Sequence, residues 1–298
     1  MNPVIGIVTV LYNGEKVLPD FFASLNVQTY LDFILYVVDN KSPDNALALT
    51  KELASKVGFR TVIIENSDNF GVAKGNNIGI RRALEDGCDL VLLSNNDVTL
   101  EINTIESLLS GMQSQHASMA VPKIYLYGTN TFWAAGGYFD KKSGLNIHRG
   151  VGVTDTGQYQ KNEQVTFAAT CFMLIDKNVF SRVGLMDETY FVYWDDTDFI
   201  YRAKTLGEVL WYIPESLVHH KEGTSTGVLS DFSIRYLYRN LIYFVLKHYS
   251  RPYAWWVIVY NVAYHTVKNI FKWPHSKWML GFRAYKEGFI LYKNKSFK

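Results

Sequence analysis

Apolar and polar residues alternate in blocks along the N-terminal part of the chain. Continuous apolar runs, each closed by polar residues or glycine, predict strands at Val4–Leu11, Phe33–Val38, Thr61–Ile64 and Leu90–Leu93. Between them, apolar residues recur at helical spacing in Val17–Val27, Asp44–Val57 and Val72–Leu84. Apolar strands that alternate with helices indicate a parallel sheet covered on both faces. Ligands bind outside the carboxyl ends of such strands, so we expect the site where these runs end.

The pattern changes after about residue 115. Short strands are predicted at Met119–Val121, Thr131–Ala135 and Val165–Ile175, around a polar stretch at 140–164, which suggests a mixed, partly antiparallel region. Asp196–Thr205 reads as a helix, and Val209–Ile213 as a strand that ends at Pro214. From Leu229 the pattern is helical to the end, with breaks at Pro252 and Pro274.

Charge is unevenly distributed along the 298 residues, although the net charge is only +2. Residues 247–298 carry ten Lys or Arg against one acidic residue, Glu287, so this tail is +9 and the rest of the chain is −7. The near-neutral total excludes a general nucleic-acid binder. A basic, aromatic tail instead suggests that one end of the protein meets an anionic surface.

The two cysteines, Cys88 and Cys171, lie in apolar surroundings, and we expect them to be buried free thiols. The N-terminus runs directly into a strand pattern, so we expect no signal peptide and a reducing, cytoplasmic setting.

Three polar motifs carry candidate chemistry. Asn95-Asn96-Asp97 places oxygen ligands at a strand end, which suits Mg²⁺ or Mn²⁺ bound to a diphosphate, although it is also an ordinary turn sequence. Asp195, Asp196 and Asp198 follow Trp194; one of these acids is a candidate general base, and the alternative is a helix-capping cluster. In His219-His220 at most one imidazole is expected to bind metal, because adjacent residues point apart; the alternative is a polar loop histidine.

The stretch Asn69–Gly79 has glycines four residues apart at a helix start. Backbone N–H groups there favour anions, and Gly71, Lys74 and Asn77 are candidates for nucleotide contacts; the alternative is tight packing of the helix on the sheet. The stretch matches neither GxGxxG nor GxxxxGK[ST], which removes the main support for a dehydrogenase or a P-loop NTPase.

The order of these motifs is more specific than any one of them. Tyr12-Asn13, Asp39, the Asn69–Gly79 stretch, Asn95-Asn96-Asp97, Asp195–Asp198 and His220-x-x-Gly223-x-Ser225 together resemble family 2 inverting glycosyltransferases of the GT-A fold. The sequence is most similar to their rhamnosyltransferase-like branch, over about residues 4–240. The resemblance implies a Rossmann-like mixed α/β sheet with helices on both faces. Residues 1–228 would form the catalytic domain, with a nucleotide-binding half at about 1–115 and an acceptor and metal half at about 116–228. Residues 229–298 would form a helical, basic and aromatic extension.

The resemblance also implies roles for single residues. The nucleotide would contact Thr9, Leu11, Tyr12, Asn13, Asp39, Gly71, Lys74, Asn77, Asn95 and Asn96. Asp97 and His220 would bind Mg²⁺ or Mn²⁺, and Asp196 would be the base, with Asp195 as the other candidate. Trp194, Asp198, Arg202 and Arg239 are candidates for contacts with the acceptor or a phosphate. For Arg202 the alternative to a substrate contact is an ion pair with Asp198. For Arg239 the alternative is a structural salt bridge.

The implied reaction is an inverting transfer of a sugar, with rhamnose as a candidate, from a dTDP- or UDP-sugar to a hydroxyl of a polysaccharide or polyprenyl-linked acceptor in bacterial surface glycan synthesis. We expect a peripheral location on the inner face of the plasma membrane. Ala254–Val267 is too short to span a bilayer, but Trp255, Trp256, Trp273 and Trp278 among cations fit an interfacial helix. The alternative is a helical pair that packs on the catalytic domain or on a second subunit of a homo-oligomer.

Two other functions compete with this one. A sugar-1-phosphate nucleotidylyltransferase would need a glycine-rich loop with cations after the first strand, and Tyr12-Asn13-Gly14 is followed by a single lysine, Lys16. A non-catalytic nucleotide-sugar-binding protein would have no use for the acids at Asp195–Asp198.

Overall fold

The computed structural model describes residues 2–221, 230–269 and 275–296. The strands are β1 (Ile5–Leu11), β2 (Phe33–Asp39), β3 (Arg60–Glu65), β4 (Leu90–Ser94), β5 (Val98–Leu100), β6 (Met119–Leu126), β7 (Phe132–Ala134), β8 (Gly137–Phe139), β9 (Asn146–His148), β10 (Glu163–Val165), β11 (Phe172–Asp176) and β12 (Leu210–His220). The helices are α1 (Leu18–Asn26), α2 (Ala46–Ala54), α3 (Gly71–Glu85), α4 (Thr104–Ser114), α5 (Lys177–Val183), α6 (Asp195–Thr205), α7 (Asp231–His248), α8 (Arg251–Asn269) and α9 (His275–Ser296).

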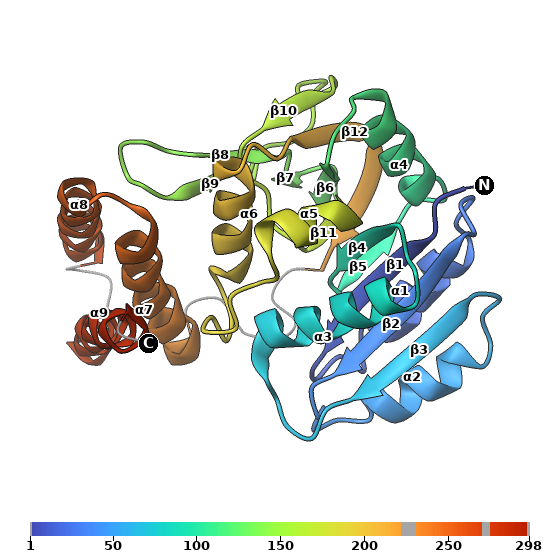
Figure 1. Ribbon diagram of the computed structural model, residues 1–298, viewed down its shortest axis with the longest axis horizontal. Coiled ribbons are helices and arrows are strands. Elements are labelled where there is room, and N and C mark those ends of the chain that lie inside the picture. Colours follow the sequence, from blue (N-terminus) through green and yellow to red (C-terminus); the bar gives the residue numbers. More distant parts are fainter. Residues whose placement is uncertain (1, 222–229, 270–274, 297–298) are drawn as a thin grey trace.

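One mixed sheet organises the body of the protein. Its order is β10-β12-β6-β11-β4-β1-β2-β3, with β5 paired to β12 and β7 paired to β6, while β8 and β9 form a separate hairpin (Figure 1). The expected mixed α/β fold with C-terminal helices is confirmed. The expected parallel portion is also confirmed, because β1 pairs in parallel with both β2 and β4.

Helices cover both faces of this parallel portion. α1 and α2 contribute to the core on one face, and α3 contributes to the core on the other. α3 can approach β1 closely because Gly75 and Gly79 face it. A Cβ on Gly79 would lie 2.3 Å from Cγ1 of Val8, and one on Gly75 would lie 2.8 Å from Cγ1 of Val10. The glycines therefore serve the tight packing that was the alternative interpretation of this stretch.

Two strand predictions are wrong in their extent. Val165–Ile175 is not one strand, because the chain leaves the sheet between β10 and β11. β12 does not end at Pro214 but continues to His220. Its register on β6 shifts between Ile213 and Leu217, and such an irregularity accommodates a proline that cannot donate to the ladder. The pattern also left β5 and α4 unassigned.

The C-terminal helices form their own apolar cluster beside the sheet. Residues of α7, α8 and α9 bury one another, among them Leu241, Phe244, Val257 and Ala284, and Tyr190 joins them from the loop before α6 (Figure 1). Pro252 lies in the first turn of α8, as a proline can, whereas Trp273 and Pro274 lie outside the described residues. In the part of the chain that the structure describes, none of the helices combines the length and hydrophobicity needed to cross a bilayer.

Candidate active site

Asp97 and His220 lie side by side, although they are far apart in the sequence. β5, directly after Asp97, pairs with the end of β12, where Val98 lies opposite His220. The backbone N–H of Lys221 donates to the Asp97 carbonyl at 2.8 Å, and Nε2 of His220 lies 3.1 Å from Oδ1 of Asp97. His219 points away and contacts Glu101, with Nε2 3.0 Å from Oε1. One histidine of the pair therefore reaches Asp97, as alternation along a strand requires.

The Asp97–His220 pair is a suitable part of a divalent-cation site. A carboxylate oxygen and an imidazole nitrogen are ligands for Mn²⁺, whereas Mg²⁺ prefers oxygen alone. Nε2 of His220 is the ring nitrogen that faces Asp97, whereas Nδ1 is buried and has no hydrogen-bond partner among the described residues. Among those residues no group of three or more His, Cys, Asp or Glu could hold an ion. Water and the diphosphate of a substrate would have to supply further ligands.

Asp195 and Asp196 begin α6 on an unusual turn. Tyr193 and Trp194 both have left-handed backbone conformations, with φ of 60° and 71°. Such residues persist only where the surroundings hold them. Here the side chain of Asn240, fully buried on α7, donates to the carbonyls of Val192 and Tyr193, both at 2.9 Å. A helix far along the chain thus fixes the turn that presents the two acids.

The two acids have different environments. Asp195 is only 4% exposed, and burial, followed by the nearby charge of Asp196, raises its pKa to about 8. Burial also raises the pKa of Asp196, but Asp196 is partly exposed and its Oδ1 accepts bonds from the backbone N–H and the hydroxyl of Thr197, at 2.6 and 3.1 Å. The backbone of Thr170 adds a further bond to this carboxylate. Near neutral pH we therefore place the proton on Asp195 and the negative charge on Asp196.

Cys171 shows that the two groups share one region. Its backbone carbonyl accepts a hydrogen bond from Asn95, two residues before Asp97, at 2.8 Å. The pKa of its thiol is raised first by burial and then by the charges of Asp97 and Asp196. Both carboxylates therefore act on the same side chain, one from the end of β4 and the other from the start of α6. A site with a cation-binding pair and a nearby carboxylate can stabilise a leaving diphosphate and accept a proton.

Comparisons with known proteins show the family of this chain. A family model described as Glycosyl transferase family 2 matches residues 6–184. The chain belongs to this family. It is 29% identical over 237 residues to "dTDP-rhamnosyl transferase RfbF" of Shigella flexneri, covering 78% of this chain and 74% of that protein. The expected glycosyltransferase, similar to rhamnosyltransferases, is thereby confirmed.

Solved structures share the GT-A fold of this glycosyltransferase. Residues 1–349 of S. aureus TarS align over 96% of this chain and 80% of that chain, with a TM-score of 0.62 and 12% identity. GalNAc-T7 with UDP, GalNAc and Mn²⁺ aligns over 73% of this chain with a TM-score of 0.60 and 18% identity. The glycosyltransferase spans only 44% of that second structure.

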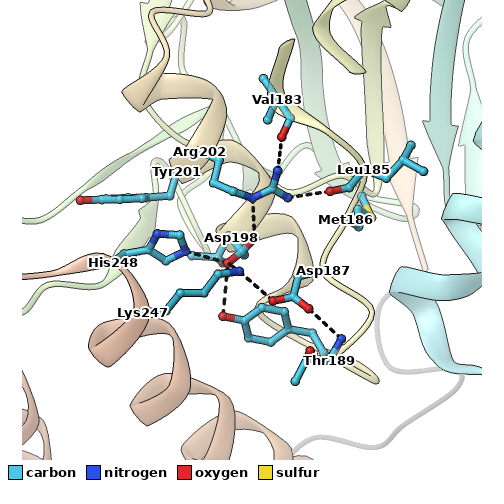
Figure 2. A network of polar contacts seen from close by, with 12 residues as sticks. Val183, Leu185, Met186, Asp187, Thr189, Asp198, Tyr201, Arg202, Lys247 and His248 are labelled. Atoms are coloured by element: carbon cyan, nitrogen blue, oxygen red, sulfur yellow. Dashed lines mark hydrogen bonds and ion pairs between the residues drawn. The ribbon is translucent and has the colours of Figure 1, made fainter. Parts of the chain in front are cut away.

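In this glycosyltransferase Asp198 belongs to an ion network that holds the fold together (Figure 2). Asp198 is fully buried, and its carboxylate lies 2.8 Å from Nε of Arg202, 2.6 Å from Nζ of Lys247 and 2.7 Å from Nε2 of His248. These partners hold its pKa well below the usual range despite its burial. The remaining nitrogens of Arg202 donate to the carbonyls of Val183 and Leu185. The alternative pairing of Asp198 with Arg202 is thus confirmed, and Asp198 joins α6 to α7 through Lys247 and His248.

Arg239 and Trp194 also face protein groups. Nε of Arg239 donates to the side-chain oxygen of Asn240 at 2.8 Å, and its guanidinium lies 4.5 Å from the centre of the Tyr236 ring. Trp194 packs against Phe244 of α7, with ring centres 5.2 Å apart. The alternative salt bridge is not what Arg239 makes, because its partner here is an amide. Contacts of either residue with a substrate stay predictions.

The expected nucleotide residues fall into two groups. Leu11 and Asp39 lie opposite each other at the ends of β1 and β2, next to exposed Tyr12 and Asn13. Asp39 is 2% exposed and accepts bonds from the backbone of Ser42, while Oγ1 of Thr9 is buried without a partner among the described residues. The Leu11 side chain belongs to the hydrophobic core, so only its backbone is available for a nucleotide.

In the second group of expected nucleotide residues, several side chains make hydrogen bonds within the protein. Asn77 is 1% exposed and bonds Met186 and Glu188, which ties α3 to the loop before α6. Asn96 donates to the carbonyl of Val10 at 3.0 Å.

The helix start is occupied as well. The N–H of Val72 donates to the carbonyl of Phe191 at 2.7 Å, and a Cβ on Gly71 would lie 2.3 Å from that oxygen. The N–H of Val72 is therefore taken by a protein carbonyl, and contacts of Gly71 and Lys74 with a nucleotide stay predictions. Lys74 lies over the ring of Phe70, 3.9 Å from its centre, and Asn95 is exposed. Gly223 and Ser225 of the histidine motif lie outside the described residues.

Three residues near the site were not among the expected site residues. Trp133 lies on β7, inside the strand predicted at Thr131–Ala135, whereas Asn146 and His148 lie on β9, within the polar stretch at 140–164. A strand of three residues such as β9 carries too little periodicity to be recognised, so no signal in the pattern pointed to it.

Proposed function

We propose that this glycosyltransferase transfers a sugar, with rhamnose as the first candidate, from a dTDP- or UDP-sugar to a hydroxyl of a lipid-linked or polysaccharide acceptor. The proposal places it in bacterial surface glycan synthesis. The observation that carries it is the position of Asp97 with His220, and of Asp196, around Cys171. The name of the Shigella flexneri relative supports a dTDP-rhamnose donor. The titles of the solved neighbours, which include TarS in complex with UDP-GlcNAc, support uridine donors equally.

The proposed reaction is a single in-line displacement with inversion. Asp196 takes the proton of the acceptor hydroxyl while that oxygen attacks the anomeric carbon. The bond from this carbon to the diphosphate oxygen breaks, and the nucleoside diphosphate leaves with the electron pair. Asp195 stays protonated and thus keeps a second negative charge away from Asp196. A divalent ion bound by Asp97 and His220 would neutralise charge on the leaving group.

A panel of nucleotide sugars tests the donor and the ion together. Thermal unfolding is followed with dTDP-rhamnose, UDP-glucose and UDP-GlcNAc, each with Mn²⁺, Mg²⁺ or EDTA. A ligand that binds only the folded state raises the unfolding temperature as its concentration exceeds the Kd. We expect stabilisation by at least one nucleotide sugar with Mn²⁺, and a smaller effect for Asp97→Ala. Donor binding that is the same with Mn²⁺ as with EDTA, and the same in Asp97→Ala as in the wild type, would contradict the metal site.

We further propose that α8 and α9 contact an anionic membrane from the cytoplasmic side. Trp255, Val259 and Phe282 expose 54%, 61% and 46% of their surface. Exposed Arg283 and Lys286 lie near Phe282 on α9. Aromatic rings at the headgroup level, with cations on anionic lipid, are typical of interfacial helices. A second copy of the chain on this face is the alternative.

Vesicle flotation distinguishes these two occupants. The double variant Trp255→Glu, Phe282→Glu is expected to lose binding to phosphatidylglycerol vesicles. The control Leu31→Glu changes a residue that is 72% exposed between α1 and β2 and should bind as the wild type does. A concentration-dependent dimer that the double variant abolishes, without any vesicle binding by the wild type, would favour the second copy.

A further inference from the structure

The β8–β9 hairpin places polar side chains on the face that lies toward the site. Gly137 pairs with His148 and Phe139 with Asn146. Successive residues of a strand point to opposite sides, so Asn146 and His148 share one face and Ile147 lies on the other. Ile147 is 37% exposed, whereas Asn146 and His148 are each partly buried.

One end of this face reaches the Asp97–His220 pair through Trp133. The ring of Trp133 meets the His220 ring edge-on, with centres 4.6 Å apart, and lies 5.2 Å from the His148 ring. His220, Trp133 and His148 therefore form a continuous aromatic row that begins at a predicted metal ligand, and the His148 ring also packs edge-on against buried Phe167, with centres 5.1 Å apart.

The other end of the face reaches Asp196. Nδ2 of Asn146 donates to the hydroxyl of Thr197 at 3.2 Å, and that hydroxyl lies 3.1 Å from Oδ1 of Asp196. β9 thus runs between the two groups that the proposed reaction requires. A sugar that offers its hydroxyl to Asp196 would lie against Asn146.

His148 has an unused hydrogen-bonding atom in this row. Its Nδ1 is buried without a partner among the described residues, which is costly for a polar atom. Burial lowers the pKa of His148 to about 4, so the ring is neutral near pH 7 and offers one donor and one acceptor. A sugar hydroxyl that reached the ring would find Nδ1 without a protein partner.

The tip of the hairpin is held by the C-terminal helices. Four successive carbonyls accept side-chain hydrogen bonds: those of Lys141, Lys142, Ser143 and Gly144 from Tyr253, Trp256, Asn261 and Tyr249 respectively, at 2.7, 3.1, 2.8 and 2.8 Å. The hairpin extends from the body of the protein toward α8 (Figure 1). Three of the four donors lie on α8, the helix that exposes Trp255, so α8 holds the tip of the hairpin in place.

We propose that Trp133, Asn146 and His148 form the subsite for the acceptor sugar, held in place by α8. The inference rests on the proposed glycosyl transfer. An aromatic ring beside an amide and a neutral imidazole is the combination that recognises a pyranose, with an apolar ring face and polar hydroxyls around it. The subsite takes the acceptor and not the donor, because Asn146 is bonded to Thr197, the residue that follows Asp196 on α6.

Steady-state kinetics of His148→Ala against Ile147→Ala test the subsite. The probes are octyl glycosides of rhamnose, N-acetylglucosamine and galactose, with dTDP-rhamnose and UDP-GlcNAc as donors, and the first pair that the wild type converts is used. We expect His148→Ala to raise the KM for the octyl glycoside about tenfold, the size of one lost hydrogen bond, with a smaller change in the donor Kd. Ile147→Ala, on the opposite face of the same strand, should match the wild type.

Two results would overturn the assignment of this subsite to the acceptor. An equal rise of donor Kd and acceptor KM assigns the row to the donor and overturns the inference, as does a His148→Ala enzyme that matches Ile147→Ala. His148→Asn keeps a polar group, and its acceptor KM should lie between the two; this holds the test open if His148→Ala does not fold. A wild-type protein that converts none of the pairs and binds none of the donors would instead contradict the proposed function itself.

Discussion

The two sides of the sheet's active edge are built differently. On the nucleotide side, Leu11 and Asp39 end neighbouring parallel strands, and their placement needs only the order of strands along the chain. On the reaction side, Asp196 depends on Asn240 in α7, and Asp97 meets His220 only after β5 pairs with β12. The nucleotide side can therefore be predicted from local sequence patterns. The reaction side is made by contacts between segments that are far apart in sequence, and the charged residues there divide into those that can react and those that hold the segments together.

The largest expected effect comes from the single carboxylate that we assign to proton transfer. Asp196→Asn should reduce the transfer rate by about 10²–10⁴-fold, the usual contribution of a general base. Donor binding, followed by calorimetry with Mn²⁺, should persist, because the change lies on the reaction side. Loss of donor binding together with activity would show that Asp196 supports the nucleotide side as well.

Asp198→Asn tests the ion network of Figure 2, which belongs to the same turn but is structural. Removing the buried charge takes the carboxylate away from Arg202 and His248, while Lys247 keeps its pair with Asp187. Breaking such a pair typically costs about 3–5 kcal/mol in the free energy of unfolding. Denaturant unfolding measures it, with Glu52→Gln as control, since the Glu52–Lys56 pair is exposed on both sides and should contribute at most about 0.5 kcal/mol. Equal losses in the free energy of unfolding for Asp198→Asn and Glu52→Gln would show that the buried network contributes no more to stability than an exposed pair.

The protonation of Asp195 predicts a pH dependence. Its folded pKa is raised to about 8, so the folded state holds a proton that the unfolded state releases above its ordinary pKa. Stability from this group is therefore greatest below about pH 4 and is lost progressively up to about pH 8. One pKa unit corresponds to about 1.4 kcal/mol, so Asp195→Asn should gain a few kcal/mol relative to the wild type between those limits. Unfolding in EDTA at several pH values checks this, and a constant difference would refute the protonated state.

Asn240→Ala breaks the link from α7 to the turn. Two buried carbonyls lose their donor, at a cost of about 1–3 kcal/mol each, and Tyr193 and Trp194 are no longer held in left-handed conformations. We expect kcat to fall more than the donor Kd changes. Asn294→Ala, at an exposed position on α9, is the matched control. An Asn240→Ala enzyme with wild-type kcat would show that the turn keeps its conformation without the hydrogen bonds from Asn240.

The smallest effect is expected on the nucleotide side. Gly79→Ala would push a methyl against Val8 and destabilise the fold by about 1–3 kcal/mol, as overpacking commonly does. Gly58→Ala, where no heavy atom lies within 4 Å, should be close to neutral. Since Gly79 faces the sheet, the donor Kd should follow the folded fraction. A specific loss of donor binding would instead place the helix in the nucleotide site.

Individual residues show which site predictions a sequence motif supports. Asp97 and His220 were paired from a resemblance in motif order, and the structure brings them to 3.1 Å. Asn77 carries an equally suggestive amide, yet its bonds go to Met186 and Glu188. A motif lists polar groups, but whether a group faces a ligand or another loop depends on partners that the motif does not contain.

The amino-acid order by itself determined the parallel strands, the helices between them and the strand ends where polar residues gather, because hydrophobic periodicity acts over neighbouring residues. Only the tertiary structure decided that Asp195 is buried while Asp196 is accessible, that a carbonyl of Phe191 caps α3, and that a short hairpin brings Asn146 and His148 between the two reactive groups. These features depend on which distant segments meet, and burial and hydrogen bonding exist only once they do.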